Sequence, residues 1–435
     1  MRSSSFAPPR RPRPFVSAPV FVTSMLWLTT CGGPDQPAKA PPPAEIPSVV
    51  APTTPPVANA DSESDIEEAR WIASHQSGDG RWEAAGWDRW RRGERVTGER
   101  LPGLGSASLD VAVTSLALLA YAGAGYTSAS EGLQGAVVAW GLHALLELQE
   151  SEGAFGDPKG ANWPVNQGLA ILALTEYAEM LLDARLVEAV RRGVRRVHRS
   201  RAVEGDRWTS EHVFGGLPPF AWVALASKDA VVATKNANRK GDGGSATGLE
   251  SDKSLAEYRA TISAWVSLPD RERSLAKLGL SLAFGDREDK AWKESPTVVA
   301  AATWLAEHRP VWEPTGKGVD AMGWWLGSEG LFAVGGESWK RWEAAMKTGI
   351  IEQQHRDGSF CELKGSWDPV GAGAEEGGRA FMTATCALSL EIWYRYDAVL
   401  GVSEPKDVTQ PKAAPKPKPP PDESTLPRRR YSRCP

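Results

Sequence analysis

Five polar residues stand at or near the predicted ends of buried helices and could take part in acid–base chemistry. They are Asp110, Glu211, His212, Asp320 and Asp368. Hydrolysis of a glycosidic bond needs two carboxylates about 5–10 Å apart, so the four acids are candidates for chemistry on a polysaccharide. Helix N-capping is the alternative for Asp110 and Asp320, because a carboxylate there accepts a bond from a backbone N–H. For His212 we favour an ordinary residue at a helix start.

Aromatic side chains and one arginine near these positions could form a binding surface for an isoprenoid chain or a sugar ring. The candidates are Trp163, Trp222, Trp324, Trp325, Trp367 and Arg379. Packing inside a helical core is the alternative for each tryptophan. Both interpretations are open for these rings.

The motifs of most other chemistries are missing from the sequence. It contains no GxSxG elbow, no Walker A loop, no HExxH and no GxGxxG. The four cysteines form no CxxC pair, so we expect no metal site, and no cofactor is implied. His355, Asp357 and Cys361 are close in sequence, but a repeated turn explains their spacing. A net charge of -4, without a basic domain, argues against nucleic-acid binding.

A short motif recurs along the chain and indicates repeated structural units. A helical pattern, a glutamine, an acid–glycine pair and an aromatic residue follow one another in residues 68–82, 144–155 and 349–360. Partial copies lie at 302–308 and 204–208. The glycine closes the helix in a left-handed conformation, and the glutamine amide can donate to carbonyls of the last turn. The aromatic residue is expected to pack against the neighbouring unit.

Between these motifs lie helical segments that are apolar nearly all round, which indicates burial on both sides. Each can be paired with a more polar outer helix, which gives about six helical hairpins. The outer helices are expected at about 64–76, 132–149, 183–199, 254–268, 295–308 and 338–354. The inner helices are expected at about 109–123, 164–181, 211–227, 272–284, 319–334 and 379–397. Six stacked hairpins can close into a ring, so we predict an all-α chain folded as an α/α toroid, or (α/α)6 barrel.

The motif Gln-x-x-Asp-Gly-x-Trp/Phe resembles the repeat of the squalene-cyclase and protein-prenyltransferase superfamily, whose members are α/α toroids. Residues 336–342, 377–379 and 390–396 are similar to bacterial secreted proteins with this repeat. The resemblance covers about 65–400 and implies the fold. The superfamily's catalytic signatures are absent: there is no Asp-x-Asp-Asp acid, no Asp-x-Cys zinc pair and no Gly-Cys-Gly-Glu-Gln thioester. The resemblance therefore implies a member without the known catalytic motifs.

The N-terminus is typical of an exported bacterial protein. Four arginines precede an uncharged run at 15–30, which is shorter than the ~20 residues that span a bilayer. Residues 28–33 resemble a lipobox in which Cys31 is lipidated, with Thr30 where glycine or alanine is preferred. The predicted organisation is a signal peptide at 1–31, a Pro-rich linker at 32–61, a toroid domain at 62–401 with an insertion at 229–251, and a disordered Pro-, Lys- and Arg-rich tail at 402–435.

Three functions are compatible with these features. The first, which we prefer, is a non-catalytic toroid tethered to the bacterial cell envelope through lipidated Cys31, binding an apolar ligand or an envelope protein. The second is a polysaccharide hydrolase or lyase on an (α/α)6 barrel, with a glycan as substrate. The third is a divergent terpenoid cyclase or prenyltransferase, which the missing motifs and the export signal make the least compatible.

Overall fold

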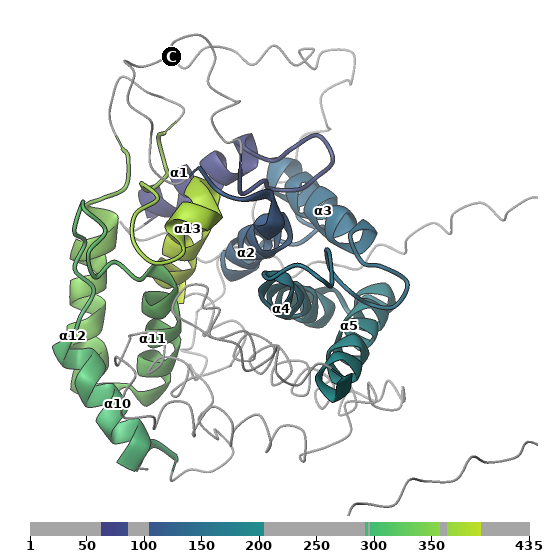
Figure 1. Ribbon diagram of the computed structural model, residues 1–435. Coiled ribbons are helices and arrows are strands. Elements are labelled where there is room, and N and C mark those ends of the chain that lie inside the picture. Colours follow the sequence, from purple (N-terminus) through teal and green to yellow (C-terminus); the bar gives the residue numbers. More distant parts are fainter. Residues whose placement is uncertain (1–61, 86–103, 204–291, 295, 357–362, 393–435) are drawn as a thin grey trace, which may run out of the picture. The chain divides into compact units, whose positions relative to one another are not determined.

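The computed structural model describes residues 62–85, 104–203, 292–294, 296–356 and 363–392 (Figure 1). Within these ranges the chain forms nine α-helices and no strand. A single isolated bridge joins Gln149 to Phe155. The prediction of an all-α chain is confirmed for this part of the protein.

The half-exposed helices coincide with five of the six outer helices that the sequence predicts. They are α1 (Ser62–Ser74), α3 (Gly132–Glu147), α5 (Ala184–Val203), α10 (Pro296–Glu307) and α12 (Gly336–Met346). A π-helical turn, η4 (Lys347–Ile351), continues α12. Each of these helices buries one apolar side and leaves another side in solvent, as an outer helix should.

The buried helices coincide with four of the six predicted inner helices. They are α2 (Asp110–Gly123), α4 (Trp163–Leu181), α11 (Ala321–Val334) and α13 (Ala374–Leu390). In α2 every residue after the first is buried. Because these sequences carry apolar or small residues on all sides, they can pack against neighbours in every direction. Their burial forms the main core of the described residues.

The helix contacts follow the order of the hairpins and then return to the first one. Helix α2 packs against α3 and α4, and α4 packs against α5. Helix α11 packs against α10, α12 and α13. Helix α13 also packs against α1 and α2, so the last inner helix contacts the first hairpin.

One inner helix begins with a break. Gly378 interrupts α13 with a φ of +69°, and the regular helix starts at Arg379, the position at which the sequence predicts the last inner helix to begin. A Cβ at Gly378 would overlap the carbonyl oxygen of Ala84. The glycine is therefore required both for its conformation and for close contact with another segment.

Several predicted elements lie outside the described residues. These are the inner helices at 211–227 and 272–284, the outer helix at 254–268, the insertion at 229–251, the residues N-terminal to 62 and the tail at 402–435. No described helix combines the length and apolarity that a bilayer crossing requires.

Candidate functional site

The repeated turns share one backbone geometry. Gly80, Gly153 and Gly365 have φ values of +89°, +91° and +92°. In two of these turns the preceding glutamine closes the loop, because Gln76 Nε2 donates to Gly80 O at 3.0 Å and Gln354 Nε2 donates to Gly365 O at 3.2 Å. The left-handed glycine predicted at the end of an outer helix is confirmed at Gly80 and Gly153. In the last turn the motif predicts Gly358, which lies outside the described residues, and Gly365 has this conformation.

Each of these glycines also touches another outer helix. A Cβ at Gly80 would overlap the carbonyl oxygen of Trp140 in α3, and one at Gly153 would overlap that of Arg192 in α5. A Cβ at Gly365 would overlap the carbonyl oxygen of Glu67 in α1. The first two turns therefore dock on the next described outer helix, and the last turn docks on α1, the first described helix.

In the third turn, the aromatic residue that packs against the helix is Trp367, which the comparison of the repeated motifs within the sequence did not identify. Trp82 Nε1 donates to Ile72 O at 2.7 Å, and Trp367 Nε1 donates to Ile350 O at 2.7 Å, so the two rings occupy equivalent places. Their backbone N–H groups also pair with inner-helix threonine hydroxyls, at 3.0 Å in α2 and 3.4 Å in α13. The expected equivalence of Phe360 with Trp82 is wrong, because Trp367 makes these contacts.

An insertion explains this error. Ten residues separate Gln354 from Gly365, whereas three separate Gln76 from Gly80, so seven extra residues lie in the last turn. Residues 357–362, which include Asp357, Phe360 and Cys361, lie outside the described part of the chain.

Two of the predicted site residues, Asp368 and Arg379, meet at the start of α13 and are joined there by His355. Asp368 Oδ1 accepts a bond from the Arg379 guanidinium and lies 2.9 Å from His355 Nε2. Arg379 is fully buried and also donates to Ser366 Oγ at 3.1 Å. The His355 backbone pairs with the same loop, since its N–H donates to Ser366 O at 2.9 Å. This cluster fastens the long last turn to the inner helix.

The electrostatics of the cluster favour a structural role. The hydrogen bond from His355 and the charge of Arg379 hold the pKa of Asp368 well below its ordinary value, although burial opposes them. A carboxyl that stays ionised at physiological pH cannot donate a proton as a general acid. It does neutralise a buried guanidinium, whose charge would otherwise be strongly destabilising.

Asp110 is held differently from the N-cap that the sequence suggested. The N-cap of α2 is Leu109, and Asp110 is the first helical residue; its Oδ1 accepts the N–H of Ala84 at 2.9 Å. Burial raises the pKa of Asp110, and this bond opposes the rise. The charged groups that act on Asp110 are Arg81, Glu83 and Asp79. Asp110 therefore fastens the first turn to α2.

Asp320 is the N-cap of α11, as one of the two interpretations predicted. Its Oδ1 accepts the N–H of Gly323 at 2.9 Å. This bond satisfies one of the backbone donors that a helix N-terminus leaves without an intrahelical partner.

The described tryptophan candidates lie in the core. Trp163, Trp324, Trp325 and Trp367 are each at most 1% exposed. The Arg196 guanidinium lies 5.3 Å from the ring centroid of Trp163, and the ring centroids of Trp312 and Trp324 are 6.2 Å apart. Four other predicted site residues, Cys31, Glu211, His212 and Trp222, lie outside the described residues.

The exposed face of α3 is a feature that the sequence reasoning missed. Leu133 is 62% exposed and Trp140 is 54% exposed, and Ala136 and His143 are exposed on the same side of the helix. Residues spaced by three, seven and ten positions share one helix face. The sequence signal was available, because α3 has no charged residue before Glu147.

This apolar face differs from the surface of an ordinary outer helix. Its opposite side is already buried, through Val137, Val138 and Leu145 among others. Exposed large apolar side chains that cluster on a surface indicate an interaction site, and tryptophan is enriched where proteins bind one another. We refer to Leu133, Ala136, Trp140 and His143 as the α3 face.

Among the described residues, no group of three or more His, Cys, Asp or Glu side chains is arranged to hold a metal ion. Comparisons with protein-family models, curated proteins and solved structures found no match.

Proposed function

We propose that this protein is a non-catalytic α/α toroid, tethered to the bacterial cell envelope, that binds a partner protein through the α3 face. The observation that carries the proposal is the exposure of Leu133 and Trp140 on a helix whose other side is already buried. The fold, the tether and the partner are three parts of the proposal, and each has its own support.

The contacts between the first and last hairpins support a ring. Helix α13 packs against α1 and α2, and the Gly365 turn docks on α1 as the Gly80 turn docks on α3. A linear array of hairpins would leave its first and last members without this contact. If the remaining hairpins predicted in residues 204–291 close the ring, the chain forms the α/α toroid that the resemblance of its repeat implies.

A protein partner suits the α3 face better than a small apolar ligand does. Small ligands bind in concave pockets that cover most of their surface. The outer side of a single helix is convex, and the tryptophans first considered for a ligand cavity, such as Trp324 and Trp325, are fully buried. A partner protein can instead cover a row of apolar side chains with a complementary groove.

The roles of three candidate acids support a non-catalytic protein. Asp110 holds a turn, Asp320 caps a helix and Asp368 neutralises Arg379. The envelope tether rests on the sequence alone, through the signal-like segment, the lipobox-like Cys31 and the Pro-rich linker.

The test compares three forms of the full-length chain as baits in a solubilised envelope extract. One is the wild type, one carries Leu133→Glu with Trp140→Glu, and the control carries Val299→Glu, which changes an exposed apolar residue of α10. The proposal predicts a protein that the wild type and the Val299 control retain equally and that the α3 variant loses. Equal retention by all three forms would contradict it, and so would capture of only a second copy of the chain.

A further inference from the structure

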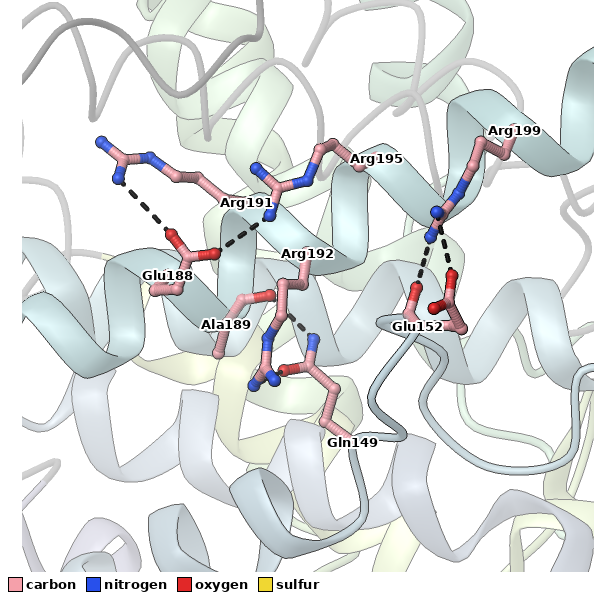
Figure 2. Close-up of polar contacts among 8 residues, drawn as sticks. All are labelled: Gln149, Glu152, Glu188, Ala189, Arg191, Arg192, Arg195 and Arg199. Carbon is pink, nitrogen blue, oxygen red and sulfur yellow. Dashed lines mark hydrogen bonds and ion pairs between the residues drawn. The ribbon is translucent and has the colours of Figure 1, made fainter. Parts of the chain in front are cut away.

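Arginines crowd the solvent side of α5. Among the residues whose side chains are described, six arginines lie along or at the start of this helix face: Arg185, Arg191, Arg192, Arg195, Arg196 and Arg199. Three acids pair with members of this set, namely Asp183, Glu188 and Glu152. Figure 2 shows the part of this surface around Gln149 and Glu188. The local surface is therefore positive on a chain whose net charge is -4.

Two of these arginines have structural roles. Arg192 donates to Gln149 Oε1 at 2.6 Å, and Gln149 Nε2 donates to Ala189 O at 2.8 Å, so the glutamine of the second repeated turn is fastened to α5 (Figure 2). Arg196 lies over the ring of the buried Trp163. These contacts hold α5 against the preceding turn and helix, and they set these two arginines apart from the outer ones.

Three of the other four arginines form a row on the outside of the helix. Arg191, Arg195 and Arg199 are four residues apart, so they follow one line along α5; we call them the arginine row. Glu188 is shared between the first two, at 3.5 Å and 3.0 Å, and Glu152 lies 2.9 Å from Arg199. The side chains of Arg195 and Arg199 are 52% and 55% exposed. Three guanidinium groups thus share two carboxylates at the surface.

We propose that the arginine row binds the phosphate headgroups of an anionic membrane surface; this inference rests on the envelope tether of the proposed function. A guanidinium presents five donors in a planar fork that matches phosphate, and the one or two contacts of Arg195 and Arg199 leave donors for further oxygens. A convex row on one helix can meet many headgroups of a deformable surface at once. It offers no enclosure for a single small anion.

The same surface suits a membrane better than a nucleic acid. Proteins that bind single strands alternate basic residues with aromatic side chains that stack on the bases. No Phe, Tyr or Trp stands between the members of the arginine row, since the intervening positions in α5 are Arg192, Gly193, Val194, Arg196, Val197 and His198. A chain with a net negative charge is only weakly attracted to a polyanion over long distances. A membrane tether does not depend on this attraction, because it holds the arginine row at a high local concentration beside the headgroups.

The test is sedimentation of the full-length chain with lipid vesicles. The protein carries Cys31→Ser, so that no lipid anchor contributes. Vesicles of pure phosphatidylcholine are compared with vesicles containing about one third phosphatidylglycerol, and the neutral vesicles report any binding by the apolar N-terminal segment. We expect preferential binding to the anionic vesicles. The variant Arg191→Gln/Arg195→Gln/Arg199→Gln should lower this anionic component roughly ten- to hundredfold, because each arginine near such a surface contributes about fivefold.

The control removes the same number of positive charges elsewhere. Lys293→Gln/Lys340→Gln/Lys347→Gln changes exposed or half-exposed lysines of other segments and should leave the anionic component unchanged. Glu188→Gln, which removes the carboxylate that two arginines share, should strengthen it. Circular-dichroism melting confirms that each variant is folded.

Three outcomes would overturn the proposal. They are equal binding to neutral and anionic vesicles, equal loss of binding in the lysine control, and binding of the row to duplex DNA but not to vesicles. None of them depends on the α3 face, so failure of this inference is separable from failure of the partner-binding proposal. If the vesicle result holds but no envelope partner is found, only the partner-binding proposal fails.

Discussion

Helices α3 and α5 are the outer helices of successive repeats, and they present different kinds of side chain to solvent. Each buries an apolar side, and each receives a glycine turn on its backbone, from Gly80 and from Gly153. The solvent side of α3 carries Leu133 and Trp140, whereas that of α5 carries arginines. The buried sides are alike because the repeat needs them. The exposed sides are free to differ, so they are where this protein's specific interactions should be sought.

The largest effect should come from breaking the docking that both helices share. Gly80→Ala and Gly153→Ala each place a Cβ against a carbonyl oxygen at positive φ, and we expect each to lower the free energy of unfolding by about 3 kcal/mol. Gly365→Ala, in the turn that docks on α1, should lower the free energy of unfolding by a similar amount, because its Cβ would also overlap a carbonyl oxygen. Chemical denaturation measures these losses.

The matched control for this prediction is Gly78→Ala. Gly78 lies in the same turn as Gly80, but a Cβ there would meet nothing within 4 Å and its φ is not in the left-handed region. It should change stability by less than about 0.5 kcal/mol. Equal losses at Gly78 and Gly80 would show that the close approach to α3 is unimportant.

The second prediction compares the two helices through the turn glutamines that bond to them. Gln76 Nε2 donates to Val137 O in α3 at 2.9 Å, whereas Gln149 bonds both Ala189 O and Arg192 in α5. Gln76→Ala should cost about 1–3 kcal/mol of unfolding free energy, because it removes two part-buried hydrogen bonds, one that closes the turn and one that joins it to α3. Gln149→Ala should cost more, because it also removes the acceptor of Arg192. The opposite order in thermal unfolding would contradict this difference between the two docking sites.

The third prediction concerns the exposed sides, which should matter for binding and hardly for folding. The double variant Leu133→Glu/Trp140→Glu should change the free energy of unfolding by less than about 0.5 kcal/mol. The triple variant Arg191→Gln/Arg195→Gln/Arg199→Gln should also change it by less than about 0.5 kcal/mol. A loss of several kcal/mol in either variant would mean that the face is part of the core, and the comparison would no longer hold. Urea unfolding of both variants beside the wild type makes the measurement.

The smallest effect is an acid sensitivity of α5. The hydrogen bond from Arg185 lowers the pKa of Asp183, at the start of the helix. A lowered pKa stabilises the folded state at pH values above the unfolded pKa, about 3.9, and this stabilisation is lost as the pH falls through the folded value. The difference in melting temperature between the wild type and Asp183→Asn should be constant above about pH 5 and shrink below pH 4. A difference that grows on acidification would contradict the pairing.

Much of the fold could be predicted because its determinants are local. Apolar periodicity located the described helices to within a few residues, and the turn glycines and the Asp320 cap follow from rules that involve only neighbouring residues. The break at Gly378 shows a limit: the regular helix starts at Arg379 as predicted, but the helical turn that precedes it from Ala374 was not predicted.

The site was less predictable because its contacts are distant in sequence or depend on insertions. The seven extra residues of the last turn hid the equivalence of Trp367 with Trp82. The hydrogen bond from Ala84 N–H to Asp110 Oδ1 joins residues 26 positions apart, so it cannot be predicted from the neighbouring sequence. The α3 face was missed for another reason: the sequence placed 132–149 among the outer helices, which are expected to present polar side chains to solvent, whereas this one presents Leu133 and Trp140.

The most direct test of the central claim places a photo-crosslinking amino acid at Trp140 in α3 and, in a second strain, at Val299 in α10, in cells that make the full-length protein. The account predicts one discrete protein adduct from position 140, absent from position 299 and abolished when Leu133→Glu is added. No protein adduct at 140, or the same adduct from both positions, would contradict it.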